Sequence, residues 1–167
     1  MVAEALVERW ALGRAKDRFR GRIAEGRVRA PEPGGGVVAG GPRVAVLCPQ
    51  TYMNDAGRSV GPARGAFKLA LERVLVVHDE IELPFGDVRT RLGGGLAGHN
   101  GLKSLKRELG GADFMRVRVG VGRPDSTDPD IVSAYVLGRF REDDTQVREL
   151  LERACEHVER VVMGEAA

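Results

Sequence analysis

Three short segments of the sequence place polar side chains where core packing does not require them. They are Thr51-Tyr-Met-Asn54, His78-Asp-Glu80 and Gly98-His-Asn-Gly101. Each segment follows a predicted strand or precedes a predicted helix. Because ligands bind at the ends of strands in open α/β sheets, we expect the three segments to converge on one cleft. An asparagine amide offers donors and an acceptor without charge, which suits it to gripping a peptide group.

Asn54 and Asn100 are the asparagines of these segments, and both are candidates for holding a substrate. The alternative is that each one caps the helix that follows it, because asparagine is a favoured N-cap residue. The sequence leaves both interpretations open.

Asp79 and His99 are the candidates for acid–base chemistry. A carboxylate such as Asp79 can orient and charge a histidine that acts as a general base, as in catalytic triads. The alternative for Asp79 is an ordinary aspartate in the turn after a strand. His99 lies in a glycine-rich loop, where its imidazole could approach a ligand closely or could anchor the loop.

The other two histidines have simpler interpretations. His78 is expected to make a local hydrogen bond at a strand end, and His157 to lie at the surface of the C-terminal helix. A metal site built from His78, Asp79, Glu80 and His99 is not expected, because adjacent side chains of a strand point in opposite directions. We predict neither a metal nor a cofactor.

The stretch Gly93-Gly-Gly-Leu-Ala-Gly-His-Asn-Gly101 is too rich in glycine for a regular element. It lacks the Gly-Lys-Ser/Thr ending of a nucleotide phosphate loop, which excludes a nucleotidase. We expect a mobile loop that brings backbone N–H groups and Asn100 to the start of a helix. Arg91, Arg116 and Arg118 could contact phosphate nearby, or they could be solvated charges on strand faces.

The elements that must position these residues alternate along the chain. Apolar residues at helical spacing predict helices over 3–12, 51–71, 102–109, 130–137 and 143–163. Alternating or continuous apolar runs predict strands over 22–29, 43–48, 73–78, 87–91 and 115–121. Prolines and glycines over 31–41 predict an exposed loop. The alternation of strands and helices implies an α/β layered fold.

Length and composition indicate a single globular domain over residues 1–167. Hydrophobic residues make up 43% and charged residues 30%, which excludes a disordered chain and a membrane protein. With no apolar run of spanning length and no secretory signal, we expect a cytoplasmic location. The net charge of +2 is too small to identify a nucleic-acid binder by itself. Cys48 and Cys155 are expected to be small apolar fillers.

Four motifs taken together resemble the bacterial peptidyl-tRNA hydrolase family in order and spacing. They are Cys48-Pro-Gln-Thr-Tyr-Met-Asn54, Val76-Val-His-Asp-Glu80, Gly93-Gly-Gly-Leu-Ala-Gly-His-Asn-Gly-Leu102 and Phe114-Met-Arg-Val-Arg-Val-Gly-Val-Gly-Arg-Pro124. The resemblance covers nearly the whole chain. It implies a monomeric α/β enzyme with a mixed sheet flanked by helices, which hydrolyses the ester between a peptide and the terminal ribose of tRNA without a metal.

The resemblance also implies roles for residues of the cleft. Asp79 would support the basic form of the catalytic histidine, and Asn54 and Asn100 would hold the peptidyl-adenosine end of peptidyl-tRNA. The other cleft residues that it implies are Tyr52 and Met53, which would line the cleft, and His99, in the mobile loop beside it.

Two further features come from the same resemblance. Arg91, Arg116 and Arg118 fall where the basic surface of the family meets tRNA. Ala97 stands where the family pattern usually has glycine, which would stiffen the loop slightly.

The front of the sequence departs from the family pattern. Family members open with an apolar strand, a Gly-Asn-Pro-Gly loop and an Arg-His-Asn segment whose histidine is the general base. Here Met1–Glu4 falls at the first predicted helix instead. We therefore expect an N-terminally truncated chain that lacks the first strand and the catalytic histidine of the family. Its activity is expected to be impaired, and its unpaired sheet edges to favour self-association.

Two other functions remain open for the sequence. A tRNA-binding pseudoenzyme would keep the cleft and the basic surface but would have lost its general base. A peptide-binding module unrelated to RNA would show no salt-sensitive affinity for tRNA. Both differ from an ester hydrolase in a measurable way.

Overall fold

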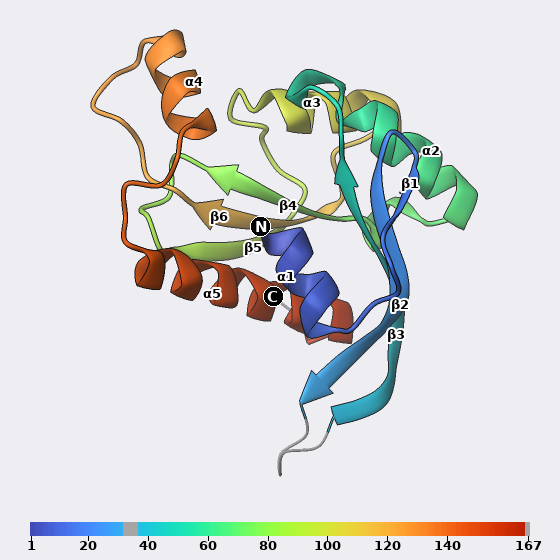
Figure 1. Ribbon diagram of the computed structural model, residues 1–167. Coiled ribbons are helices and arrows are strands. Elements are labelled where there is room, and N and C mark those ends of the chain that lie inside the picture. The colour runs from blue at the N-terminus through green and yellow to red at the C-terminus, as the bar shows by residue number, and fades with distance from the viewer. Residues whose placement is uncertain (32–36, 166–167) are drawn as a thin grey trace. The chain divides into compact units, whose positions relative to one another are not determined.

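The architecture is that of a computed structural model, which describes residues 1–31 and 37–165 (Figure 1). The helices and 3₁₀ turns are α1 (Val2–Arg9), η1 (Met53–Asp55), α2 (Gly57–Phe67), η2 (Leu71–Arg73), α3 (Asn100–Leu109), α4 (Pro129–Leu137) and α5 (Asp144–Met163). The strands are β1 (Lys16–Arg18), β2 (Gly21–Pro31), β3 (Val37–Pro49), β4 (Leu75–Glu80), β5 (Val88–Leu92) and β6 (Met115–Gly120). This mixture of helices and strands confirms the predicted α/β class.

The chain forms two compact units. Unit 1 contains Met1, Ala3–Leu75 and Leu92–Met115. Unit 2 contains Val2, Val76–Arg91 and Arg116–Ala167. A single domain over residues 1–167 stays a prediction.

Unit 1 contains the antiparallel sheet β1-β2-β3. β2 and β3 form a long hairpin with a register irregularity between Arg27 and Arg29. Both predicted strands are confirmed and are longer than expected; residues 32–36 of the predicted loop over 31–41 lie outside the described residues. The sequence does not predict β1, because its three residues are all exposed and show no apolar alternation.

The first helix is confirmed with a shorter C-terminal end. α1 stops at Arg9, before the predicted end at Leu12, and Ala11 then adopts a left-handed φ of 46°. Leu6 and Trp10, on the predicted apolar face, are buried. The apolar face is therefore as predicted, and the turn at Ala11 sets the boundary.

The segment predicted as one irregular helix over 51–71 is divided between η1 and α2. α2 contains Pro62, which removes a backbone donor inside the helix, and its C-cap is Lys68, whose φ of 52° is left-handed. The first residue of α2, Gly57, donates its N–H to Ser104 Oγ over 3.0 Å, and a Cβ there would lie 2.3 Å from Ser104 O. Only glycine fits, so α2 starts directly against α3.

Unit 2 contains most of the mixed sheet β4-β6-β5, in which β6 is central. The backbone hydrogen bonds that set its directions run from Met115 N to Val74 O, Val121 N to Glu80 O, Gly120 N to Asp87 O and Gly93 N to Phe114 O. The first two partners advance together along the chain, so β4 and β6 are parallel. The last two run in opposite directions, so β5 is antiparallel to β6. The expected mixed sheet is confirmed.

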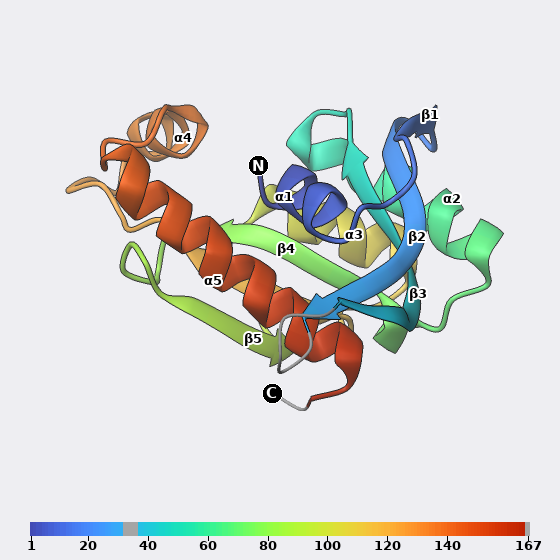
Figure 2. The same cartoon turned by 60° about the horizontal axis from the view of Figure 1, so that its bottom comes forward.

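The long C-terminal helix lies beside β5 in unit 2 (Figure 2). Its start is fixed by a capping box, in which the Asp143 carboxylate accepts from Gln146 N over 2.8 Å. Its buried residues are Leu150, Ala154, Cys155 and Val158, from the predicted apolar stripe. Arg153 Nη1 also donates to Gly86 O over 3.0 Å, which ties the helix to the segment before β5.

The two cysteines differ in their surroundings. Cys155 is buried, as predicted, but Cys48 is exposed and the prediction of a filler role is wrong for it. Cys48 pairs in the sheet with Arg22, which is itself exposed, so no core forms over that position. Within residues 1–31 and 37–165, no helix has the length and apolar character that crossing a bilayer requires.

Candidate active site

The segment after β3 turns sharply and presents three side chains to solvent. Asp55 N donates to Tyr52 O over 2.9 Å, and Ala56 N donates to Met53 O over 3.2 Å, which together shape η1. Tyr52 is 84% exposed and Met53 is 52% exposed, although both are large and largely apolar. Asn54 is exposed as well. The three side chains therefore offer apolar surface and an amide to a ligand.

His99 is the N-cap of α3. Its Nδ1 accepts from Leu102 N over 3.3 Å, so the neutral ring carries its proton on Nε2. This bond satisfies one of the orphan donors at the start of the helix. The anchoring role considered for His99 is therefore real, and the ring is held at a defined place in the loop.

Gly101 brings η1 and the start of α3 into contact. A Cβ at Gly101 would lie 2.6 Å from Met53 Sδ and 3.0 Å from His99 Cε1. The absence of a side chain lets both groups pack against the same backbone position. Since Asn54 follows Met53 and Asn100 follows His99 in the chain, the two asparagines belong to this same neighbourhood.

The capping interpretation is wrong for both asparagines. The N-cap of α3 is His99, with Asn100 already inside the helix, and the N-cap of α2 is Ala56. Within residues 1–31 and 37–165, neither Asn54 nor Asn100 makes a side-chain hydrogen bond. Both amides are exposed and available to a ligand.

The loop before α3 needs its glycines for backbone conformation. Gly93, Gly94 and Gly98 have φ values of 61°, 92° and 76°. Ala97 also takes a left-handed φ, 45°, where its Cβ makes the conformation strained. The departure from the family pattern at Ala97 is thus a site of local backbone strain.

In unit 2, the polar end of β4 has its own hydrogen bonds. His78 is buried, and its Nδ1 lies 2.7 Å from Asp79 O, which confirms the predicted local bond. Asp79 is half-buried, between the buried residues His78 and Glu80. Because side chains alternate along a strand, the Asp79 carboxylate points to the face opposite to those two.

The arginines of β6 meet a carboxylate of the neighbouring strand. Arg118 Nε donates to Glu80 Oε2 over 3.0 Å, and both side chains are largely removed from solvent. Arg116 is 2% exposed; burial lowers its pKa most, followed by the positive charges of Arg91 and Arg118, while Glu80 opposes the shift. The alternative of solvated strand-face charges is therefore wrong for Arg116. Arg91, on β5, is exposed.

His157 is not at the surface as predicted. It is half-buried on α5, and its Nδ1 lies 2.9 Å from Thr90 Oγ1 of β5. Burial, and then the positive charge of Arg160, lower the pKa of His157. The helical periodicity could not reveal this contact, because it depends on where β5 lies against α5.

The predicted site residues are thus distributed between the two units. Unit 1 holds Tyr52, Met53, Asn54, His99 and Asn100. Unit 2 holds Asp79, Arg91, Arg116 and Arg118. No group of three or more His, Cys, Asp or Glu side chains in the described part of the chain is arranged to hold a metal.

Two residues of these surroundings are not identified as functional by the sequence. Gly101 follows Asn100 directly, and the spacing gives no sign that it packs against Met53. Glu80 is considered only as a metal ligand, whereas it pairs with Arg118. A buried carboxylate on one strand and two arginines on another could have suggested this pair, had the strand order been known.

The protein thus combines an α/β fold with a mixed sheet, a glycine-rich loop that leads into α3, and two exposed asparagines that do not cap a helix. The sequence pattern of the peptidyl-tRNA hydrolase family matches residues 1–167. The peptidyl-tRNA hydrolase of Rhodopseudomonas palustris (strain BisB18) is 40% identical over 165 residues, covering 98% of this chain and 75% of that protein. The enzyme of that name from Afipia carboxidovorans is 41% identical over 165 residues, with the same coverage.

Solved structures agree with the sequence comparison. The crystal structure of peptidyl-tRNA hydrolase from Acinetobacter baumannii matches with a TM-score of 0.80 at 30% identity, covering 98% of this chain and 78% of that chain. The chain belongs to the peptidyl-tRNA hydrolase family. Since peptidyl-tRNA hydrolases are ester hydrolases, the predicted enzyme class is confirmed as well.

Proposed function

We propose that the protein hydrolyses the ester bond between the peptide and the terminal ribose of peptidyl-tRNA, and that it does so in the cytoplasm. The observation that carries the proposal is the pair of exposed amides, Asn54 and Asn100, whose chain neighbours Met53 and His99 both pack close to Gly101. Neither amide has a capping role that would account for it. In a family of ester hydrolases, two such amides suit the binding of a peptide bond and the adenosine next to it.

The other predicted site residues of each unit have tasks of their own. Tyr52 and Met53 offer exposed apolar surface to the end of the substrate. His99, held by its bond to Leu102 N, keeps the start of α3 and therefore Asn100 in place. Asp79 is the acid that would support the basic form of a catalytic histidine supplied by a front segment, as the acid of a triad does. Arg91 offers an exposed charge to tRNA phosphate, whereas Arg116 is buried and Arg118 is paired with Glu80, so these two contribute less.

The general base is a separate question from substrate binding. Each of the three histidines among the 167 residues has another role. His78 is buried and bonded locally, His157 is bonded to Thr90, and His99 caps α3. A positioned general base contributes about 10² to 10⁴ in rate. We therefore expect the 167-residue chain alone to turn over peptidyl-tRNA near background.

The test measures release of tRNA from an N-acetyl-aminoacyl-tRNA. The 167-residue chain is compared with the same chain preceded by the front segment of the Acinetobacter baumannii relative. We expect the extended chain to be faster by about 10² or more, and Asp79→Asn to remove most of that gain. Full turnover by the 167 residues alone would contradict the claim that none of the three histidines acts as the general base.

The same assay, together with tRNA binding measured at several salt concentrations, separates the alternative functions. A tRNA-binding pseudoenzyme would bind tRNA in both forms, with an affinity that falls steeply with salt, and would hydrolyse in neither. A peptide-binding module would show no salt-sensitive affinity for tRNA at all. Light scattering of the 167-residue chain tests the predicted self-association.

A further inference from the structure

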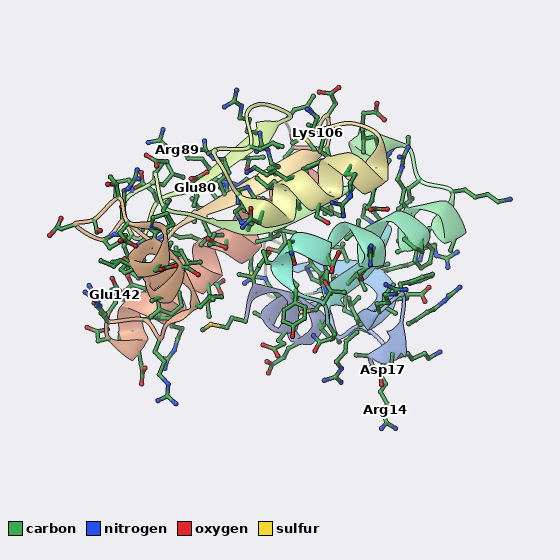
Figure 3. The ribbon with its side chains drawn as sticks, turned by 90° about the horizontal axis from the view of Figure 1, so that it is seen from above. Arg14, Asp17, Glu80, Arg89, Lys106 and Glu142 are labelled. Atoms are coloured by element: carbon green, nitrogen blue, oxygen red, sulfur yellow. The ribbon has the colours of Figure 1, made fainter. Side chains whose placement is uncertain are left out.

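The turn between β1 and β2 carries a dense group of exposed positive charges. Its basic side chains are Arg14, Lys16, Arg18, Arg20 and Arg22, named the turn cluster here. All five are exposed, and Figure 3 shows Arg14 extending away from the ribbon. The only acidic residue between 14 and 22 is Asp17, which lies across from Arg22 in the strand register. Five positive charges and one negative charge leave a net charge of +4.

The charges of the turn cluster form no close ion pair within the described part of the protein, although, after the N-terminal amino group, the charge of Arg22 helps to lower the pKa of Glu4. None of its five side chains forms an ion pair with a residue that the structure describes. The Arg18 guanidinium lies 4.3 Å from the centroid of the Phe19 ring, which orients it without neutralising it. Phe19 in turn packs edge-on against Phe67 of α2, with ring centroids 6.0 Å apart. The turn is thus fastened to α2 and holds one guanidinium in place.

The backbone of this turn is strained. Phe19 and Arg20 are the two residues between the paired ends of β1 and β2, and their φ values are 56° and 52°. Such a two-residue turn is made with least strain by Asn-Gly or Gly-Gly. Phe19 has a packing role that accounts for its presence, but the Arg20 side chain has none among the described residues. Backbone strain that packing does not explain is a reason to look for a ligand.

We propose that the turn cluster binds the phosphodiester backbone of the RNA substrate, in addition to the arginines of β5 and β6 discussed above. The proposal rests on the proposed function, which makes tRNA the substrate. Guanidinium groups match the geometry of phosphate oxygens and stay charged at any physiological pH. Lys16 and Arg18 lie on one face of β1 about 6.8 Å apart along the strand, so the cluster presents a row of cations rather than one.

The test measures binding of deacylated tRNA to the 167-residue chain over a series of salt concentrations. The variant R18Q/R20Q/R22Q removes three of the five charges. At about threefold per exposed arginine, we expect roughly 30-fold weaker binding. We also expect the log–log salt slope to fall by about two to three units. Unchanged affinity and slope would overturn the proposal, and so would a failure of the unaltered chain to bind tRNA.

Matched variants separate a local effect from a change in net charge or folding. R73Q/R139Q/R148Q removes three exposed arginines elsewhere and is expected to change the affinity by less than about threefold. R18K/R20K/R22K keeps the charges and is expected to keep the slope. If the two neutralising variants weaken binding equally, the turn cluster has no special role and the proposal is wrong.

A single substitution makes the binding and folding effects run in opposite directions. Arg20→Gly removes one cation but relieves the left-handed conformation, so its thermal midpoint should not fall. Its affinity for tRNA should still fall about threefold. An unchanged affinity would count against a phosphate contact at Arg20.

Deacylated tRNA contains no ester, so the result is independent of hydrolysis. Weaker binding by the variant, together with no hydrolysis of peptidyl-tRNA by the 167-residue chain or by the extended chain, would keep this inference and reject the proposed function. Hydrolysis of peptidyl-tRNA together with unchanged binding by the variant would do the reverse.

Discussion

Arg116 and Arg118 on β6 and Arg18 and Arg20 at the β1–β2 turn have the same residue type and the same spacing, but their surroundings are opposite. Arg116 is 2% exposed, and Arg118 is bonded to the buried carboxylate of Glu80. Arg18 and Arg20 are exposed and meet no carboxylate in the described part of the chain. The β6 pair is largely buried or paired inside the protein, whereas the charges of the turn pair are exposed to solvent or to a ligand.

The position of two arginines in the sheet decides whether they pair within the protein or stay exposed. The β6 arginines lie on the central strand of a sheet, where the neighbouring strand β4 supplies Glu80 as the partner of Arg118. The turn arginines lie at the end of a hairpin, where strand pairing supplies only Asp17. Whether the charges of two such arginines are neutralised within the protein therefore depends more on a carboxylate of the adjacent strand than on the spacing of the arginines in the sequence.

The largest expected effect is on stability and comes from Glu80→Gln. Removing one partner of a buried ion pair leaves the other charge without compensation. We expect the free energy of unfolding to fall by about 2 to 4 kcal/mol, measured by urea denaturation.

The matched control for that experiment is Glu82→Gln, which breaks the ion pair with Arg123. Both of its side chains are about half exposed, at 51% and 43%. We expect a loss within about 1 kcal/mol. Equal losses for the two variants would mean that the β6 arginines are no more dependent on internal pairing than surface ones.

An intermediate effect is expected at the strained residue of the glycine-rich loop. Ala97→Gly relieves a left-handed φ of 45°, at the cost of more freedom in the unfolded chain. We expect a net gain of about 0.5 kcal/mol in the free energy of unfolding. The reverse control is Gly110→Ala, at a φ of 75° with open space around the added Cβ, which should lose about 1 kcal/mol. A loss on Ala97→Gly would show that Ala97 makes stabilising contacts that outweigh its strain.

The smallest effect is a pH dependence from His157. Its pKa is lowered in the folded protein, so the unfolded chain binds a proton near its ordinary pKa of about 6.5 while the folded chain does not. The free energy of unfolding should therefore decrease as the pH falls through about 6.5, and this contribution should level off below the lowered pKa.

His157→Gln keeps a partner for Thr90 and removes the titration. Urea unfolding at several pH values should show a shallower acid loss for His157→Gln than for the unaltered chain. The same slope in both proteins would mean that His157 is not a source of the acid sensitivity.

Much of the fold follows from the sequence because periodicity is local. The apolar stripe of α5 and the alternation of Met115 to Gly120 predict their elements within a residue or two at the ends. β1 is too short and too polar for any pattern, and the break between η1 and α2 depends on the close packing of Gly57 on Ser104. That contact joins residues far apart in sequence, so periodicity could not supply it.

The sequence predicts less of the candidate site than of the fold. The motifs identify Asn54 and Asn100, but only the helix boundaries show that neither one is a cap. The sequence likewise gives Arg116 and Arg118 as a basic face without the buried Glu80 that pairs with Arg118. In both cases the missing information is a partner from another segment of the chain.

The central claim, that Asn54 and Asn100 hold the peptidyl-adenosine end of the substrate, can be tested without turnover. The chain has two asparagines and two glutamines, so its side-chain amides give four pairs of NMR signals. These are assigned with Asn54→Ala and Asn100→Ala and followed while a non-hydrolysable amide analogue of a peptidyl-adenosine is added. We predict that both asparagine pairs shift with one binding curve, while Gln146, held in the capping box of α5, does not. Binding of the analogue with both asparagine pairs unmoved would contradict the claim.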